Sequence, residues 1–340
     1  MPHVEGRPPY SCAMRRGSVT ATAFAPGSIG NVGPGFDVLG LAVEGIGDRV
    51  TVTLADGPSR VAAITGRDAA LVPRDAERNC AAIAALALLR GRGRAEGVVV
   101  TVEKGLPLAG GFGGSAASSV AGAYAAHLAL AAGDDGSGAS AAAAGNGERP
   151  TALDREIMTA ALAGERTVAG CHLDNIAPQV LGGLALVRST EPLDVVPVRL
   201  AGGWWAAVVT PRVHVETRAA RALLPAALPR AEWVQQMANT AALVYAFATG
   251  DAALLARALD DPHAEPRRAP LIPRFAEVKA AALAAGASGC SISGSGPSVF
   301  AIAVDEQVAR RCARAMQAAF GDVPSDAHVG GVARQGVRPA

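Results

Sequence analysis

The sequence predicts an α+β fold with two domains, and three observations carry that prediction. The chain has 340 residues, enough for two domains of about 150 residues each. Hydrophobic residues make up 50% of it and charged residues 18%, a balance typical of packed cores and not of disorder. Short β-branched segments alternate with longer apolar segments of helical spacing, with no repeat of solenoid length.

The first half of the chain is predicted to contain strands and helices in alternation. Its strands combine β-branched and small residues. One helical segment has no formal charge apart from a histidine, so it should be buried on nearly all sides; it covers residues 115–132. The strands are predicted at residues 19–25, 50–54, 61–65, 97–103 and 184–187, and the other helices at residues 75–90 and 152–169.

The second half continues the alternation, after a domain boundary predicted near residues 189–192. The boundary separates an N-terminal domain, 19–190, from a C-terminal domain, 191–340. Residues 1–18 predict a disordered extension, and the low-complexity residues 133–150 predict a flexible insertion. Strands are expected at residues 195–200, 204–210, 289–293, 298–304 and 328–333, and helices at residues 216–224, 231–249, 252–259, 275–285 and 306–320.

Charge and cysteine content exclude several functional classes. The 31 basic and 30 acidic residues give a net charge of +1, so no field gathers nucleic acid or an anionic membrane surface. No apolar run approaches the roughly 20 residues that a membrane span needs. The 5 cysteines are scattered without a CxxC pair, which predicts a reducing cytoplasm and neither a disulfide framework nor a zinc site.

A glycine-rich loop at residues 107–117 follows a valine-rich strand and precedes a helix. Glycines let backbone N–H groups approach a ligand, and a helix start adds unpaired N–H donors and partial positive charge. The segment therefore suits an anion such as a phosphate. It matches neither the Walker nor the dinucleotide-binding glycine pattern. From the loop alone, a tight turn that only packs the helix on the sheet is an equally good interpretation.

Three further segments carry glycines or paired polar residues: residues 28–40, 172–178 and 293–298. Each also has a plain structural interpretation: turn caps for the first, an Asx turn or a helix cap for the second, and a hairpin for the third. Together with the loop they resemble the GHMP small-molecule kinases, and within them the homoserine kinase family. The resemblance rests on six segments in order, PGSIGNVGPGFDVLG, PLAGGFGGSAAS, HLDNIAP, ETRAARALLP, AEPRRAPLIPRF and SGSGPSVFAI.

The resemblance implies both a fold and a reaction. The fold has an N-terminal domain like ribosomal protein S5 domain 2 and a ferredoxin-like C-terminal domain. The reaction converts ATP and L-homoserine into ADP and O-phospho-L-homoserine, a step toward threonine, and the family is often homodimeric. Two alternatives stay open: a kinase of the same fold for another small hydroxy compound, and a non-catalytic nucleotide-binding homologue.

The resemblance also assigns the nucleotide side of the site. Lys104 would approach a phosphate or the ribose, although a solvated lysine at a strand end is the plain interpretation. Asn79, at a helix start, would lie near adenine. The triphosphate would lie against Pro107, Leu108, Ala109, Gly110, Gly111, Phe112, Gly113, Gly114, Ser115, Ala116 and Ala117.

On the acceptor side, five residues match those that the family uses around homoserine. Asp37 has the charge to hold the ammonium group, and two arginines have the planar fork that pairs a carboxylate. Asn175, with Asp174 beside it, would position the reacting hydroxyl, since phosphoryl transfer needs alignment and charge neutralisation more than early deprotonation. The five residues are Asn31, Asp37, Asn175, Arg221 and Arg268. For both arginines the plain interpretation is a surface charge.

A magnesium ion is the implied second cofactor, bridging phosphate oxygens and held by few protein groups. Glu165 and Ser115 are the candidate ligands. The sequence departs from the family at Phe112, where Leu or Met is usual, and at Gly114, where the family has the first serine of a pair. The stretch from Glu165 to Asp174 is also one residue shorter than in the family, so the departures from the family pattern gather around the implied metal site.

Overall fold

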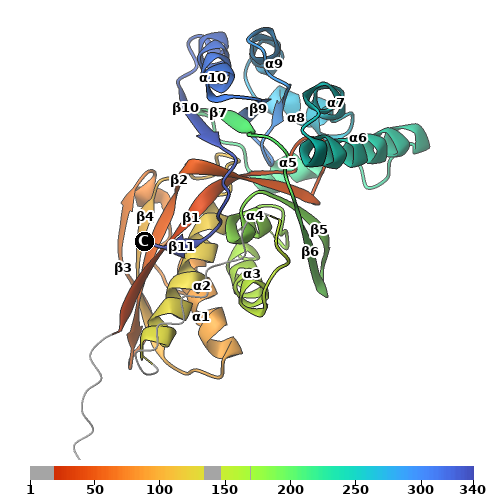
Figure 1. Cartoon of the computed structure of the whole chain (residues 1–340). Helices are drawn as coiled ribbons and strands as arrows, with labels where there is room; N and C mark the ends of the chain where they lie inside the picture. Colours follow the sequence, from red (N-terminus) through yellow and green to blue (C-terminus); the bar gives the residue numbers. More distant parts are fainter. Residues whose placement is uncertain (1–18, 134–146, 169) are drawn as a thin grey trace, which may run out of the picture.

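The computed structural model describes residues 19–133, 147–168 and 170–340 (Figure 1). The predictions for residues 1–18, and for the part of the insertion at 134–146, lie outside the described residues. The described chain forms two sheets with helices packed on them, which confirms the α+β class. No helix within the described ranges has both the length and the hydropathy that crossing a bilayer requires.

The first sheet has seven strands and is built around a long, bent β2. Its main path is β11-β1-β2-β4-β3, and β5 pairs with the start of β2 and with β6. β3 and β4 run parallel, and the other pairs are antiparallel. The strands are β1 (Thr20–Gly30), β2 (Leu39–Ala55), β3 (Arg60–Gly66), β4 (Gly97–Lys104), β5 (Leu184–Thr190), β6 (Leu193–Val198) and β11 (Arg338–Pro339).

β1 is longer than predicted. We expected it to end at residue 25, before a glycine-dense loop, but it continues to Gly30 after a register shift between Pro26 and Gly27. Small residues make the extension possible: a Cβ on Gly47 would lie 2.1 Å from the Ala25 carbonyl oxygen. The first residues of the glycine-dense segment therefore pair with β2 as part of β1, and the turn begins only at Asn31.

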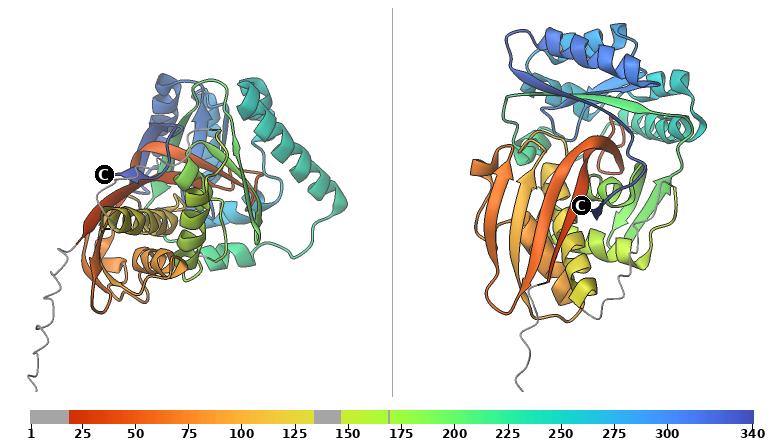
Figure 2. Two further views of the ribbon diagram at one scale, coloured as in Figure 1. Left: turned by 60° about the horizontal axis from the view of Figure 1, so that its bottom comes forward. Right: turned by 60° about the vertical axis from the view of Figure 1, so that its left-hand side comes forward.

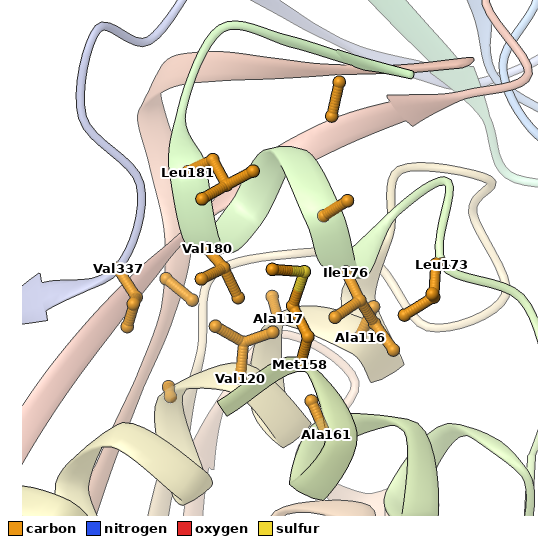
Figure 3. Close-up of a cluster of buried hydrophobic side chains, with 14 of the residues drawn as sticks. Ala116, Ala117, Val120, Met158, Ala161, Leu173, Ile176, Val180, Leu181 and Val337 are labelled. Atoms are coloured by element: carbon orange, nitrogen blue, oxygen red, sulfur yellow. The ribbon is translucent and has the colours of Figure 1, made fainter. Parts of the chain in front are cut away.

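Four helices cover one face of this sheet (Figure 2). They are α1 (Cys80–Gly91), α2 (Gly114–Gly133), α3 (Ala152–Glu165) and α4 (Ile176–Leu181). As predicted, α2 is buried along most of its length. Figure 3 shows Ile176 and Val180 of α4 beside Ala116, Ala117 and Val120 of α2. This packing fixes α4 to the helix that follows the glycine loop.

The second sheet is antiparallel with the order β10-β7-β9-β8. In chain order this is 4-1-3-2, the ferredoxin-like arrangement expected from the resemblance. Its strands are β7 (Trp205–Pro211), β8 (Gly289–Ile292), β9 (Val299–Ala303) and β10 (Ser325–Gly331). The helices of this half are α5 (Thr217–Ala222), α6 (Arg230–Thr249), α7 (Ala252–Ala258), α8 (Ala264–Arg268), α9 (Phe275–Ala284) and α10 (Glu306–Phe320), and short 3₁₀ turns lie at η1 (Ala69–Leu71) and η2 (Ala269–Leu271).

The chain passes from the first sheet to the second later than the predicted domain boundary at residue 190. That point lies in the turn between β5 and β6, and β6 completes a hairpin with β5 in the first sheet. The chain therefore crosses to the second sheet only after Val198. It returns after β10, where Val332 bridges to Val43 and β11 pairs with β1. One apolar core includes residues of both sheets, so a cleft at their seam has rigid walls.

Candidate active site

A cleft of about 370 Å³ lies at the seam of the two sheets. One end is formed by the glycine loop and by the turn at Leu71, Val72 and Pro73, and the other by α5, α8 and the turn at Gly294. It brings together 15 of the predicted site residues. They are Asn31, Asp37, Lys104, Leu108, Ala109, Gly110, Gly111, Gly113, Gly114, Ser115, Glu165, Asp174, Asn175, Arg221 and Arg268.

In the glycine loop the carbonyl groups are held by the protein. The Gly111 oxygen accepts a hydrogen bond of 2.6 Å from Ser293 Oγ, and the Gly113 oxygen accepts one of 2.9 Å from Gln179 Nε2. The Gly110 oxygen accepts from the Ser298 hydroxyl. The first N–H groups of α2 have no partners within the helix, and the loop that precedes them lines the cleft. This geometry favours the phosphate site over a plain packing turn.

Four predicted nucleotide residues do not line this cleft. The side chains of Phe112, Ala116 and Ala117 are buried in the core, and Figure 3 shows the two alanines against α4. Pro107 lines a neighbouring hollow instead. Ala116 and Ala117 face the core because helix periodicity turns only part of α2 toward the cleft.

Lys104 lines the cleft, but its ammonium group is already paired. It forms a buried ion pair with Asp48, and it donates 2.8 Å to the Gly114 oxygen and 3.0 Å to Ser118 Oγ. Asp48 also accepts from the backbone N–H groups of Gly105 and Leu106, at 3.0 and 3.1 Å. Lys104 and Asp48 therefore hold both ends of the loop. This overturns the solvated interpretation of Lys104, which is buried, while the approach to a phosphate or the ribose stays a prediction.

Asn79 is the fifth predicted residue absent from the cleft lining, and it caps α1. Its Oδ1 accepts from the N–H groups of Ala81 and Ala82, at 3.1 and 3.2 Å. Its Nδ2 donates 2.9 Å to the Pro73 oxygen. With the side chain buried and all of these groups in use, Asn79 supports the wall at Pro73 and does not face the space where adenine was expected.

The acceptor end is built around a bidentate ion pair. Arg221 Nη1 and Nη2 donate 2.9 and 2.8 Å to the two oxygens of Asp37. The guanidinium carbons of Arg221 and Arg268 both lie 5.2 Å from the centre of the Phe36 ring. Arg268 is 3% exposed and donates 2.9 Å to the Gly294 oxygen. Burial, and then the charge of Arg221, lower the Arg268 pKa. Two cations and one anion thus converge here, and Arg268 is no surface charge.

Asn31 organises the turn between the two ends. Its N–H donates 3.1 Å to Asp174 Oδ2, its Oδ1 accepts 2.9 Å from the Asp37 N–H, and its Nδ2 donates 2.9 Å to the Gly294 oxygen. Both Asn31 and Asp37 have left-handed φ, 65° and 58°, which Asn and Asp tolerate better than other side chains. Burial, and then the charge of Asp37, raise the pKa of Asp174 to about 6.

Comparisons with known proteins show the family of this chain. A family model described as "GHMP kinases C terminal" matches residues 243–322. A homoserine kinase of Chlorobaculum tepidum is 38% identical over 335 residues, covering 94% of this chain and 98% of the relative. The chain belongs to the homoserine kinase family. A second relative of that name, from Xanthomonas campestris, is 41% identical over 92% of this chain and 90% of its own length.

Solved structures extend the homoserine kinase comparison to the fold. The crystal structure of a homoserine kinase from Cytophaga hutchinsonii has a TM-score of 0.84 at 36% identity, and it covers 98% of this chain and 100% of that one. A mevalonate kinase of L. major in complex with R-mevalonate has a TM-score of 0.68 at 14% identity, covering 96% and 100%. The latter is similar in fold alone.

In this member of the homoserine kinase family, Glu165 and Ser115 meet at the start of α2. Ser115 Oγ donates 3.0 Å to Glu165 Oε1, while Glu165 Oε2 is buried without a hydrogen-bond partner. Burial raises the pKa of Glu165 to about 7. Across the described ranges no group of three His, Cys, Asp or Glu side chains could hold a metal. A carboxylate and a hydroxyl are ligands that Mg²⁺ accepts when phosphate oxygens and water complete the shell.

Sequence reasoning missed several residues of this homoserine kinase family site. His172 lines the cleft with its Nδ1 3.6 Å from Asp37 Oδ1, and burial lowers its pKa. It lies within the HLDN segment, so the motif carried the signal. Asp48 had a weaker signal, as a charge on the strand face that Val50 and Val52 share. Ser28 lies within the first segment of the resemblance and Gln179 directly follows HLDNIAP, but no local pattern relates either residue to the partners that it contacts.

Proposed function

We propose that this chain transfers the γ-phosphoryl group of ATP to the side-chain hydroxyl of L-homoserine, forming O-phospho-L-homoserine on the route to threonine. Membership of the homoserine kinase family supports the proposal. The structural observation that carries it is one cleft in which Asp174 and Asn175 lie between a glycine loop and a pocket with two arginines and an aspartate. The free state of all four cysteines that the structure describes supports a cytoplasmic location.

The acceptor end suits a zwitterion with a short hydroxylated side chain. The carboxylate of the substrate would pair with Arg221 and Arg268, and its ammonium group with Asp37. Arg221 and Asp37 pair with each other, so a bound substrate would replace this ion pair by contacts of its carboxylate with the two arginines and of its ammonium group with Asp37. Because a neutral sugar or a simple monoacid lacks one or both of these charges, the pocket favours amino acids.

Alignment of the substrate hydroxyl with the γ-phosphoryl group would account for most of the catalysis. The hydroxyl oxygen forms a bond to the γ-phosphorus while the bond from that phosphorus to the departing ADP oxygen breaks. The hydroxyl proton passes to Asp174, whose pKa of about 6 leaves it ionised at neutral pH. Backbone N–H groups at the start of α2 would face the phosphate oxygens, where preorganised donors stabilise developing charge.

Glu165 and Ser115 would hold the Mg²⁺ that accompanies ATP. The unpartnered Glu165 Oε2 is the structural observation in favour. When bound, the ion supplies charge neutralisation on the phosphates. We expect Glu165→Gln to raise the Mg²⁺ concentration that gives half-maximal rate about tenfold. Glu156→Gln, an exposed change on the same helix, serves as the control.

An ADP-release assay tests the proposed function. L-homoserine, mevalonate, galactose and shikimate are each offered at saturating ATP and Mg²⁺. Turnover confined to L-homoserine supports the proposal. Turnover with another compound would identify a kinase of different specificity, and ATP binding without any turnover would identify a non-catalytic homologue. Either result overturns the proposal while leaving the fold assignment intact.

We propose further that the chain forms a homodimer through α6. The exposed side of this helix presents Trp233, Val234, Met237 and Tyr245, between 49% and 61% exposed, and no charged residue lies between Glu232 and Asp251. Two copies packed antiparallel would place Trp233 opposite Tyr245. They would also bring Arg230 of one copy toward Asp251 of the other, a charge complementarity that favours a second copy over another partner.

Light scattering on the protein as it elutes from a size-exclusion column tests whether this dimer forms. We expect Met237→Glu to convert a dimer of the chain into a monomer, because it places two like charges near the two-fold axis. Val196→Glu, on the exposed side of β6, should leave the dimer intact. A monomeric wild-type chain, or a dimer unaffected by Met237→Glu, contradicts the assignment to α6.

A further inference from the structure

Two buried side chains connect the glycine loop to Asn175 through three hydrogen bonds. Gln179 Nε2 donates 2.9 Å to the Gly113 oxygen and 2.9 Å to Ser28 Oγ, and Ser28 Oγ donates 2.9 Å to Asn175 Oδ1. Ser28 and Gln179 are both fully buried. The contacts come from the loop, β1 and α4, which are separated by more than sixty residues in the chain.

Glycine at position 113 makes this meeting possible. A Cβ there would lie 2.3 Å from Ser28 Oγ, 2.6 Å from Gln179 Nε2 and 2.9 Å from Asn175 Oδ1. Its φ of +68° also belongs to the left-handed region. The loop backbone, the serine, the glutamine and the asparagine therefore share one small volume that no side chain at 113 can enter.

The direction of the chain of bonds follows from chemistry. A carbonyl oxygen can only accept, so the end of Gln179 that faces Gly113 is its NH₂ group. The second hydrogen of that group goes to Ser28 Oγ. Ser28 then has one hydrogen to donate, and the atom of Asn175 that receives it is the amide oxygen. The asparagine is therefore left with its NH₂ group for the cleft, next to Asp174 Oδ1 at 3.5 Å.

We infer that Ser28 and Gln179 are positioning residues. They fix the Asn175 amide with its NH₂ group toward the reacting hydroxyl, in an orientation that depends on the position of the glycine loop. This inference rests on the proposed function. The NH₂ group donates to the hydroxyl oxygen, which turns the hydroxyl hydrogen toward the carboxylate of Asp174. An unrestrained amide could flip and present its oxygen, which competes for the same hydrogen.

The anchoring of α4 supports this role. Ile176 and Val180 pack on the same helix, α2, that begins at the glycine loop (Figure 3). Asn175 lies at the N-terminus of α4 and Gln179 one turn later. A shift of the loop is therefore transmitted both through the packed helices and through the three hydrogen bonds, so nucleotide binding and hydroxyl orientation are coupled.

A double-mutant cycle tests the inference. Ser28→Ala should lower kcat about tenfold with little change in KM for L-homoserine, and Gln179→Leu should do the same. In an Asn175→Ala background, Ser28→Ala should cost no further kcat, because there is no amide left to orient. An equal loss in both backgrounds would show a general structural role and overturn the inference. Ser119→Ala, another buried serine that donates to a carbonyl, is the matched control.

Nucleotide binding gives a readout that is independent of the acceptor. Calorimetric Kd values for a non-hydrolysable ATP analogue with Mg²⁺ should rise about three- to tenfold in Gln179→Leu, less in Ser28→Ala and least in Asn175→Ala, following distance from Gly113. A wild-type chain that binds the analogue but does not turn over L-homoserine would contradict the proposed function only. An unordered or flat series of Kd values would contradict the coupling, whatever the acceptor.

Discussion

The two ends of the cleft are built in opposite ways. The end that we propose for the nucleotide comes from one continuous strand, loop and helix, and the groups that it offers a ligand belong mostly to the backbone. The acceptor end that we propose takes single side chains from the loop between β1 and β2, from the HLDN segment, and from α5 and α8, and Asp37 and Arg221 are 184 residues apart in sequence. Asp37 and Arg221 pair with each other across the cleft.

This difference teaches how each end can fail. A backbone site depends on conformation, so a single methyl group in the wrong place can destroy it. A side-chain site depends on individual charges, so a substitution there should weaken the binding of one substrate and leave the binding of the other unchanged. The predictions below test this contrast, beginning with the largest effect.

Gly113→Ala should be the most damaging substitution in the cleft. The alanine would have to adopt a φ of +68°, and its Cβ would collide with Ser28. Left-handed strain and overpacking together cost about 3–4 kcal/mol, a loss of several hundred-fold in kcat/KM for ATP. Steady-state kinetics with ATP varied gives the measurement.

Gly91→Ala is the control for this effect. An added Cβ at Gly91 meets nothing within 4 Å, and the residue ends α1 outside the cleft. We expect unchanged kinetics and an unchanged or slightly higher Tm. If Gly113→Ala keeps wild-type affinity for ATP, the nucleotide end is not the conformation-dependent backbone site described above.

Arg221→Met should act on the acceptor alone. Loss of a charge-assisted contact costs about 2–3 kcal/mol, which raises KM for L-homoserine about 30- to 100-fold. KM for ATP should change less than about twofold, because the two ends share no charged ligand. Arg218→Met, an exposed arginine on the same helix α5, should leave both values unchanged. Equal increases in both KM values would erase the contrast between the ends.

How far the sequence predicts each end follows from the same contrast. Gly110–Gly114 are contiguous, so glycine content and the flanking strand and helix identified the loop. Asp37 and Arg221 could be paired only through the resemblance to a family, since no local pattern relates them. The helix α4 was not predicted because residues 172–178 were interpreted as a loop, although α4 begins at Ile176 and accepts Pro178 in its first turn.

Strand alternation held information about Lys104 that the prediction did not use. Val98, Val100 and Val102 are buried on one face of β4, and Lys104 has the same parity. Asp48 has the parity of Val50 and Val52 on β2. Two opposite charges on inward positions of paired strands predict a buried ion pair, which is what the structure shows. The prediction also requires the register of β2 against β4, which places the two residues side by side and which strand alternation alone does not give.

The pH dependence of the reaction tests the group between the two ends. Burial raises the pKa of Asp174 to about 6, so the carboxyl gains its proton as pH falls through 6. We expect the wild-type rate at pH 5 to be about tenfold below that at pH 7.5. This fall is the acidic limb of the pH–rate profile, and we expect Asp174→Asn to lose this limb. Glu165→Gln at saturating Mg²⁺ should keep it. If Glu165→Gln loses the limb and Asp174→Asn keeps it, the titrating group is Glu165.

The smallest effect is expected at Asn79, where the nucleotide end depends on a side chain. Asn79→Ala removes the cap of α1 and the bond to Pro73, so the free energy of unfolding should fall by about 1 kcal/mol. Asn79→Asp keeps an acceptor for the cap but cannot donate to the Pro73 oxygen. We expect near wild-type stability, and a rise of about two- to fivefold in KM for ATP as the wall loosens.

Nucleotide discrimination separates wall support from direct contact with the base. If Asn79 only holds Pro73 in place, Asn79→Asp should raise KM for ATP and GTP by the same factor, because the wall serves either base. A direct contact to adenine would instead change the ratio of the two KM values, since a carboxylate offers acceptors where the amide offers a donor. A changed ratio would mean that this end also reads its ligand through a side chain, and that the two ends of the cleft differ only in degree.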